Sequence, residues 1–257
     1  MILKPWCILA TLAVLALAAT GCSKRKTERS TSPAPSSTQE NDTEAPTGKS
    51  PAALRAKCAG TGTGAALACD DLADIYAEGS ADTPKDSALA LKYYTQACDK
   101  GLNLGCRHLA GVYIHGTGVD VDRPRAVKLY TKACDGGLML ACDDLGDVYA
   151  KGLGGPAEPA LAVPIYLKAC DGGLGMACGH LAHLYRDGRG VPKAPSQAIA
   201  YYLKGCNGDS PLSCDDLGDV YAKGIGVPVD RNKARTYYKK ACDAKLSLGC
   251  DHLDALK

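Results

Sequence analysis

From about residue 51 onwards, apolar residues recur at the spacing of an amphipathic helix. In one stretch Leu145, Gly146 and Tyr149 follow Cys142 by three, four and seven positions, so these residues share one helical face. The stretch ends at Gly152, and a glycine there is typical of a helix C-terminus. We call such a segment helix A and predict one in every unit described below.

A second predicted helix, helix B, follows each helix A after a short loop. Asp86, Asp122 and Asp230 precede three of these helices and are the expected N-caps. Small residues that let neighbouring helices approach closely lie at Ala90, Ala126, Ala162, Ala198 and Ala234. The third helix B contains Pro159 and Pro164, and we expect Pro164 to shorten or kink it.

Cysteines show that the two helices repeat. After Cys7 and Cys22 they fall in six pairs, which are Cys58 and Cys69, Cys98 and Cys106, Cys134 and Cys142, Cys170 and Cys178, Cys206 and Cys214, and Cys242 and Cys250. In each of the last five pairs the cysteines are separated by eight residues, and these five pairs follow one another at steps of 36. A period of this length indicates an all-α solenoid of stacked helical hairpins. The predicted units are 67–103, 104–139, 140–175, 176–211 and 212–247, between a half unit at 51–66 and a terminal helix at 248–257.

The first 50 residues have a different character. Lys4 and an apolar stretch from Cys7 to Ala19, too short to span a bilayer, predict an export signal at 1–21. The signal ends in LAATGC, which resembles the lipobox of bacterial lipoproteins and implies a lipid on Cys22. A plain secretory signal is the alternative. Residues 22–50, rich in Ser, Thr and Pro, are expected to form a disordered tether.

Composition narrows the function. A net charge of +2 excludes a polycation that holds nucleic acid by charge alone, and 46% hydrophobic residues exclude wholesale disorder. Fourteen cysteines exceed what a reducing cytosol usually tolerates unless metal explains them. With the leader, they predict a protein of the bacterial cell envelope, on the periplasmic or surface side of the outer membrane, or else a secreted one.

The repeated columns identify a family resemblance. The segment ACDGGLMLAC at 133–142, followed by Leu145, Gly146 and Tyr149, is similar to the Sel-one-like repeat, a relative of the tetratricopeptide repeat. It resembles most the cysteine-rich version found in the Hcp-type family of secreted bacterial proteins. The resemblance covers 51–257 and implies a right-handed α-solenoid.

The cysteine pairs are best explained as disulfides. Each pair places one cysteine at the end of helix B and the other at the start of the next helix A, where a disulfide would clamp the turn. Zinc binding and redox catalysis are the alternatives, but there is no C-x-x-C and no further ligand near each pair. We therefore expect six disulfides, formed in chain order.

Helix A also carries a stripe of acidic and imidazole side chains, which we expect to face outward. The motif D-D-L-x-D occurs three times, and histidines occupy its second position in the units between. The candidate binding face comprises Asp70, Asp71, Asp74, His108, Asp143, Asp144, Asp147, His180, His183, Asp215, Asp216, Asp219 and His252. Either these residues complement the helix dipole, or they bind a basic peptide or a divalent metal. Only His180 and His183, one turn apart, are a local metal candidate, and we expect neither metal nor cofactor.

No persuasive catalytic motif occurs in the repeats. The main functional prediction is a monomeric, envelope-tethered scaffold that binds an envelope or extracellular protein or peptide through an acidic concave face, which suits a basic partner. The alternative comes only from the resemblance, because Hcp-type proteins are described as penicillin-binding proteins with slow β-lactamase activity. No nucleophile or base for that reaction can be assigned from the sequence.

Overall fold

The computed structural model describes residues 50–80 and 82–256, which belong to one compact unit. The predicted signal, the lipidation of Cys22 and the tether up to residue 49 lie outside the described residues. The described part contains helices and no strand. The helices are α1 (Pro51–Cys58), α2 (Thr63–Glu78), α3 (Ser87–Asp99), α4 (Asn103–His115), α5 (Arg123–Asp135), α6 (Met139–Lys151), α7 (Pro159–Asp171), α8 (Gly175–Asp187), α9 (Pro195–Asn207), α10 (Pro211–Lys223), α11 (Arg231–Asp243) and α12 (Ser247–Ala255).

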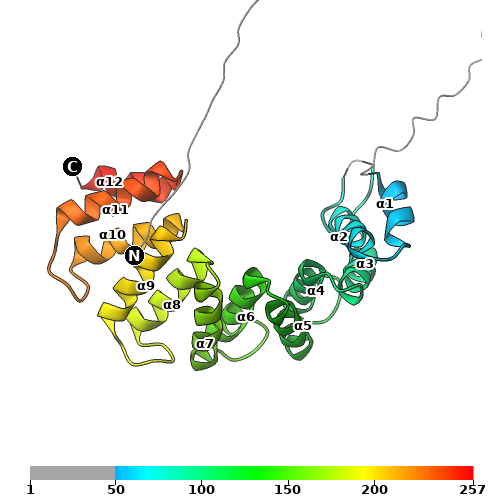
Figure 1. Cartoon of the computed structure of the whole chain (residues 1–257), viewed down its shortest axis with the longest axis horizontal. Coiled ribbons are helices and arrows are strands. Elements are labelled where there is room, and N and C mark those ends of the chain that lie inside the picture. Colours follow the sequence, from blue (N-terminus) through cyan, green and yellow to red (C-terminus); the bar gives the residue numbers. More distant parts are fainter. Residues whose placement is uncertain (1–49, 81, 257) are drawn as a thin grey trace, which may run out of the picture. The chain divides into compact units, whose positions relative to one another are not determined.

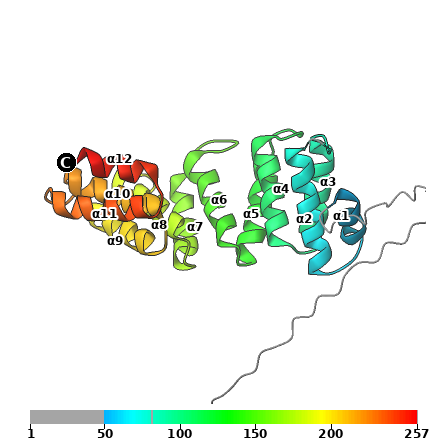
Figure 2. The same cartoon turned by 90° about the horizontal axis from the view of Figure 1, so that it is seen from above.

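Helix pairs follow one another in series, as the repeat predicts. The even-numbered helices from α2 onwards are the predicted helices A, and the odd-numbered helices from α3 onwards are the helices B. Figure 1 shows the pairs in a curved row, with α2, α4 and α6 toward the inside and α3, α5 and α7 toward the outside of the curve. Figure 2 shows the same row from above. The all-α solenoid is confirmed, and we call the surface formed by the even-numbered helices the A face.

Local capping explains where the helices begin and end. The side chains of Asp86, Asp122 and Asp230 accept hydrogen bonds from backbone N–H groups in the first turns of α3, α5 and α11, so the three predicted N-caps are confirmed. Four even-numbered helices end at a glycine in the left-handed conformation, as at Gly152 with φ of 71°. These caps satisfy backbone groups that the helices themselves cannot.

The expected shortening at Pro164 is wrong. Helix α7 has 13 residues, as do α5 and α9, although Pro164 lies inside it. The proline lies close to the N-terminus of the helix, where its missing N–H removes a single backbone hydrogen bond. Ala162 and Ala169 on the same helix are fully buried, and this packing holds the helix in place.

Disulfides join every predicted pair of cysteines. All six bonds form in chain order, with S–S distances of 1.95 to 2.06 Å. Each links the end of one helix to the first turns of the next, so the clamped hairpin predicted from the spacing is confirmed. Closing a loop of this length stabilises the folded state by about 2 to 3 kcal/mol in the chain-entropy view.

The core is a line of small residues and tyrosines between the helix layers. Ala126, Ala162 and Ala234 are completely buried, so the odd-numbered helices approach their neighbours closely there. Tyr166 and Tyr202 are among the largest fully buried side chains. Within the described part of the chain, no helix combines the length and apolar character needed to cross a membrane.

Candidate functional site

All thirteen residues of the predicted binding face lie on even-numbered helices. Each D-D-L-x-D block occupies one helix, namely α2, α6 and α10, while the histidines lie on α4, α8 and α12. The structure therefore brings the thirteen residues together on the A face. It also divides them into three groups with different surroundings.

The first aspartate of each block is buried. Asp70, Asp143 and Asp215 are 3%, 4% and 5% exposed, so these three side chains do not face outward, contrary to the expectation. Each carboxylate accepts a hydrogen bond from a histidine Nδ1 of the next even-numbered helix. The donors are His108 at 3.1 Å, His180 at 2.9 Å and His252 at 2.9 Å. The three pairs fasten neighbouring units, and their three buried carboxylates do not face a partner.

The last aspartate of each block accepts a hydrogen bond from a buried tyrosine. The pairs are Tyr94 with Asp74, Tyr166 with Asp147 and Tyr238 with Asp219, each at 2.6 Å. Burial and the neighbouring carboxylate raise the pKa of all three phenols far above the ordinary value, so they remain donors. Two aspartates, one histidine and one tyrosine thus form an Asp-His-Tyr cluster at each block.

Opposing effects set the charge of the histidines in these clusters. Burial alone lowers the pKa of His108, but the hydrogen bond and charge of Asp70 outweigh it, so that the pKa is raised. The same balance, with Asp143 as the partner, raises the pKa of His180. Asp70 and Asp143 therefore favour the charged imidazolium of His108 and His180.

The middle aspartate of a block is closer to the surface. Asp144 on α6 accepts a hydrogen bond from Arg107 Nε on α4, at 2.5 Å. Asp216 on α10 accepts one from His183 Nε2 on α8, at 2.7 Å. Asp71 on α2 is exposed. These bonds complete a series in which every two consecutive even-numbered helices, from α2 to α12, are bridged by side chains.

The histidine pair named as a metal candidate is divided between two neighbours. His180 bonds to Asp143 on the preceding even-numbered helix, whereas His183 bonds to Asp216 on the following one. Among the described residues, Asp70, Asp74 and His108 do present ligand atoms within 4.8 Å of one another. Asp70 and His108 already bond to each other. Asp74 accepts a hydrogen bond from Tyr94, so these contacts account for the geometry without an ion.

A cavity of about 180 Å³ opens on the A face between α8, α10 and α12. Met176, Leu212 and Leu248 line it together with His180, His183 and Ser213. Ser213 Oγ donates to Ser210 Oγ at 3.0 Å. No hydrogen bond joins either serine hydroxyl to an imidazole within the described part of the chain, so the geometry contains no ready nucleophile and base.

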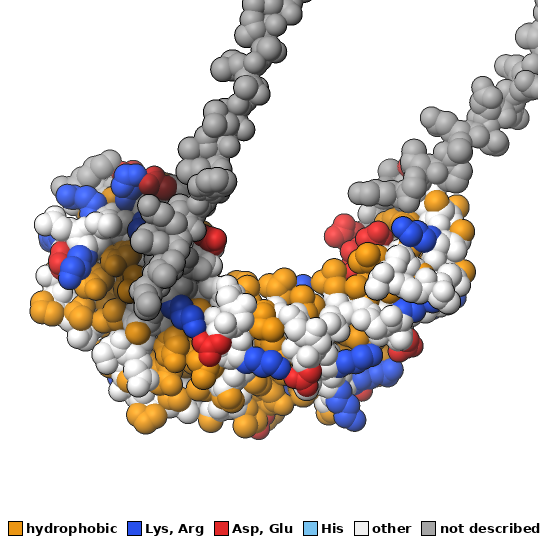
Figure 3. All heavy atoms as spheres, in the orientation of Figure 1, with side chains coloured by type: hydrophobic (Ala, Val, Ile, Leu, Met, Phe, Trp, Pro, Cys, Tyr) orange, Lys and Arg blue, Asp and Glu red, His pale blue; other side chains and the backbone are white. Residues whose placement is uncertain are grey.

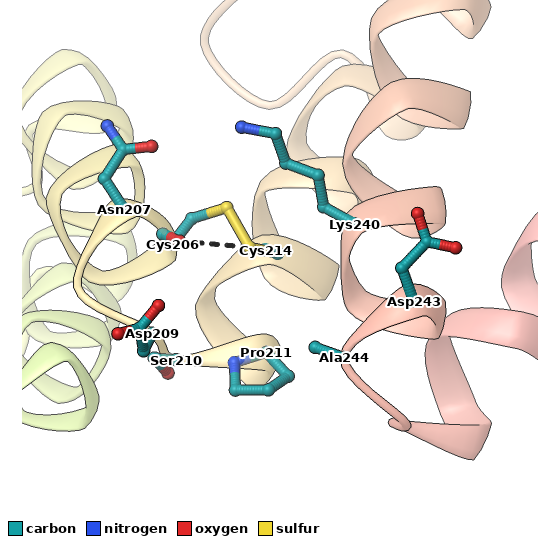
Figure 4. A pocket seen from close by; sticks show the side chains of 9 residues that line it. All are labelled: Cys206, Asn207, Asp209, Ser210, Pro211, Cys214, Lys240, Asp243 and Ala244. Carbon is teal, nitrogen blue, oxygen red and sulfur yellow. Dashed lines mark hydrogen bonds between the residues drawn. A yellow bond between two sulfur atoms is a disulfide. The ribbon is translucent and has the colours of Figure 1, made fainter. Parts of the chain in front are cut away.

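A larger depression lies beside a disulfide, at the edge where α9 turns into α10. It has a volume of about 480 Å³ and is lined by Cys206, Asn207, Asp209, Ser210, Pro211, Cys214, Lys240, Asp243 and Ala244. Figure 4 shows that the side chains of Lys240 and Asp243, both from α11, do not converge on one another. Lys240 and Asp243 therefore do not form an acid–base pair in this depression.

One set of A-face residues was missed by the sequence analysis. A large apolar residue stands two positions before the second cysteine of every pair and is exposed in five of the six units. We call this set the apolar row; it consists of Leu67, Leu104, Leu140, Met176, Leu212 and Leu248. The signal was visible in the sequence as another column, which keeps the step of 36 from Leu104 onwards.

Known structures share the helical-repeat fold of this chain. No curated protein matches the chain. Two solved structures are similar over most of the described part. A Sel1 repeat protein from Oxalobacter formigenes is 29% identical with a TM-score of 0.62, over 72% of this chain and 75% of that one. The protective antigen c5321 of uropathogenic Escherichia coli, which displays an SLR fold, is 27% identical with a TM-score of 0.61. That match covers 74% of this chain but only 41% of the antigen.

A third solved structure, the cysteine-rich protein B of Helicobacter pylori, is 27% identical with a TM-score of 0.43, over 51% of this chain and 94% of that one. The model of the Sel1 repeat matches five consecutive segments, at residues 66–102, 103–138, 140–174, 175–210 and 211–246. These segments make up well over half of the chain. They contain every residue of the predicted binding face apart from His252. The chain therefore belongs to the Sel1 repeat family.

Proposed function

We propose that this protein is an envelope-tethered scaffold that binds another protein through its A face. The chain has the scaffold fold of Sel1 repeat proteins, which typically serves protein–protein interaction. The observation that carries the proposal is the make-up of the A face, where five of the six units set an exposed large apolar residue beside charged or imidazole side chains. Such mixed surfaces, repeated along a solenoid, suit the binding of an extended partner.

The acidic part of this surface is strongest over α2. Asp71 and Glu78 are exposed there, and Asp74 is partly exposed on the same helical face. Figure 3 shows acidic side chains gathered at the end of the unit where α2 lies. A partner with lysine or arginine side chains would gain attraction at this end. The buried Asp70, Asp143 and Asp215 would then support the surface rather than touch the partner.

Six disulfides support the proposed location outside the cytosol, since such bonds persist in oxidising compartments. The lipobox-like sequence ending at Cys22 supports a lipid anchor in the bacterial envelope. We expect the anchored protein to be a monomer whose A face remains open to a partner.

Selection of a random peptide library on the oxidised protein tests the proposal. Bound peptides should be rich in lysine and arginine. Their affinity, measured by fluorescence anisotropy, should fall severalfold in the variant Asp71→Asn with Glu78→Gln. The matched control, Asp99→Asn with Asp120→Asn, removes two exposed carboxylates outside the A face and should retain full affinity. An equal loss in both variants would remove the A face from the proposal.

Hydrolysis of β-lactams is the second candidate function. Its support is the cavity between α8, α10 and α12, whose lining includes serine and histidine side chains. The test is turnover of a chromogenic cephalosporin by the oxidised protein, beside a control whose cysteines are reduced and blocked. Turnover that follows the folded protein through purification supports an enzyme, and turnover no greater than that of the control ends this candidate.

A further inference from the structure

The three D-D-L-x-D blocks differ in the residue that lies one helical turn after their last aspartate. On α6 this residue is Lys151, and on α10 it is Lys223. On α2 the same position holds Glu78. The chain thus contains two copies of one arrangement and a third copy in which a carboxylate replaces the ammonium group.

In the two later blocks the lysine binds one particular oxygen of the aspartate. Lys151 Nζ donates to Asp147 Oδ2 at 2.7 Å, and Lys223 Nζ donates to Asp219 Oδ2 at 2.6 Å. In both blocks Oδ1 accepts the tyrosine hydroxyl of the Asp-His-Tyr cluster. Each of these aspartates therefore holds a hydroxyl group and an ammonium group on separate oxygens.

The block on α2 keeps the tyrosine and lacks the ammonium group. Asp74 Oδ1 accepts the hydroxyl of Tyr94 at 2.6 Å, as its counterparts accept theirs. Among the described residues, no hydrogen bond or ion pair of Asp74 involves Oδ2. The side chain of Asp74 is 46% exposed, against 21% for Asp147 and 27% for Asp219. Asp74 therefore offers, from a more exposed side chain, the oxygen that binds a lysine in the other two blocks.

The electrostatics of the blocks differ in the same sense. Burial, with the charges of Asp70 and Glu78, raises the pKa of Asp74. Burial alone would also raise the pKa of Asp219, but hydrogen bonds from Lys223 and a tyrosine outweigh it, so that this pKa is lowered. A cation beside Asp74 would offset the repulsion that the second carboxylate adds.

The middle aspartates of the blocks show the same contrast. Asp144 on α6 is paired with Arg107, and Asp216 on α10 is paired with His183. Asp71 on α2 is exposed, and no ion pair joins it to another residue of the described part. The carboxylates three and seven positions after it lie on the same face of α2. This face therefore presents three carboxylates without the cations that the other two blocks supply for themselves.

A lysine fits this place better than an arginine. Arginine binds a carboxylate best through two parallel hydrogen bonds, which need both oxygens. One oxygen of Asp74 already accepts the hydroxyl of Tyr94, so a single oxygen is left. A lysine ammonium group is a compact charge with three donors, and it can contact Asp74 and Glu78 together because they lie one helical turn apart.

We propose that α2 binds a lysine side chain of the partner protein at Asp74, where its ammonium group takes the place that a lysine of the same helix takes in the other two blocks. We call this the lysine site; it consists of Asp71, Asp74 and Glu78. The inference rests on the proposed function and names the residue of the partner that α2 selects. The blocks on α6 and α10 carry their own cations and do not compete for it.

Peptides that differ only in their cation test the choice of lysine. Labelled peptides carry three lysines, three arginines or three acetyl-lysines among the same leucines, glycines and serines. By fluorescence anisotropy, the lysine peptide should bind the oxidised protein about threefold more tightly than the arginine peptide and at least about tenfold more tightly than the acetylated one. Equal binding of lysine and arginine, or binding of none of the three, would overturn the lysine site. The library selection judges the scaffold function separately.

Exchange of the residue one turn after the aspartate tests the site in both directions. Glu78→Lys gives α2 a lysine of its own and should weaken binding of the lysine peptide by about tenfold. Lys151→Glu leaves Asp147 without its lysine and should create a second site, so that two peptides bind per chain. The matched controls, Asp120→Lys and Lys128→Glu, make the same changes of charge at exposed positions outside the A face and should bind one peptide as the wild type does.

Equal losses in Glu78→Lys and Asp120→Lys would show that net charge controls binding, and they would overturn the inference. A single bound peptide in Lys151→Glu would also overturn it. Thermal melting verifies that every variant folds.

Three further results would assign the site to another occupant and overturn the proposal. One is calorimetric binding of calcium or zinc ions that Glu78→Lys abolishes. Another is a wild-type dimer that the same variant converts to monomers. The third is tighter binding of the lysine peptide when Lys24, Arg25 and Lys26 are replaced by serine, because the N-terminal residues of the chain would then be the occupant.

Discussion

The chain joins its units in two different ways. At the steps from α2 to α4, α6 to α8 and α10 to α12, a buried aspartate bonds to a histidine of the following helix, and a tyrosine completes the Asp-His-Tyr cluster. We call these the buried steps. At the steps from α4 to α6 and α8 to α10, the bridges are Arg107 with Asp144 and His183 with Asp216, whose side chains are partly exposed. We call these the surface steps.

The alternation shows that the structural period is two units. The sequence DDLGDVYAKG occurs identically at 143–152 and 215–224, two units apart, and both copies supply the acidic side of a buried step. Neighbouring units are therefore alike in backbone but complementary in side chains. Groups removed from water interact more strongly than groups that water screens, so the two kinds of step should differ in stability and in their response to pH and salt.

Removal of a buried carboxylate should have the largest effect. In Asp143→Ala the Nδ1 of His180 loses its acceptor, and the hydrogen bond from Tyr166 to Asp147 loses the neighbouring carboxylate. The free energy of unfolding should therefore fall by about 2 to 3 kcal/mol. Asp144→Ala, which breaks a surface step on the same helix, should cost less than about 1 kcal/mol. Urea denaturation of both variants measures the difference, and equal losses would contradict the distinction between the steps.

The pH dependence of stability should come from the buried steps. The folded pKa of His108 and His180 is raised, so their contribution is complete below the unfolded pKa and disappears as pH rises through the folded pKa. The free energy of unfolding should therefore fall as pH rises from about 6 to 8.5. The variant His108→Gln with His180→Gln should flatten this slope. His115→Gln, whose ring belongs to no cluster, is the control, and an unchanged slope in the double variant would argue against the clusters.

Loss of a single tyrosine hydroxyl should have a smaller effect. Tyr166 donates to Asp147 within a buried step, so Tyr166→Phe should cost about 1 kcal/mol. Tyr130 occupies the same column at a surface step, and among the described residues its hydroxyl has no hydrogen-bond acceptor, so Tyr130→Phe should cost less. Thermal or urea unfolding of the two variants side by side decides the matter, and the reverse order would be incompatible with the clusters.

Salt should reveal the weakest bridges. Arg107→Ala removes one partly exposed ion pair, and the expected loss is below about 1 kcal/mol at low ionic strength. At 1 M NaCl the Debye length is about 3 Å, so most of that loss should vanish. The loss in Asp143→Ala should persist at the same salt concentration. A loss in Arg107→Ala that does not respond to salt would place this pair with the buried steps.

Much of the fold could be predicted because its determinants are local and repeated. The helix spacing around Cys142, the caps at Asp86 and Gly152, and the separation of the cysteines each depend on residues within a few turns. The shortening expected at Pro164 was wrong because tertiary packing compensates for the one hydrogen bond that a proline removes near a helix start. The overall solenoid did not depend on that position.

The candidate site was harder to predict, because it depends on how neighbouring helices are rotated. Asp70 and Asp71 are adjacent in sequence, yet the first is buried and the second exposed. Their common spacing identified them as residues of helix A but could not show which one meets His108, 38 residues away. The apolar row was missed for another reason. Apolar columns usually belong to the core, and only the exposure of residues such as Leu212 distinguishes this one.

Hydrogen exchange with mass spectrometry tests the proposed binding surface most directly. The oxidised protein is compared with and without a basic peptide selected on it from the random library. Protection should appear along the even-numbered helices, most strongly at α2, where Asp71, Asp74 and Glu78 lie. Protection confined to the odd-numbered helices, or none at peptide concentrations that saturate the A face in the binding assay, would contradict the account.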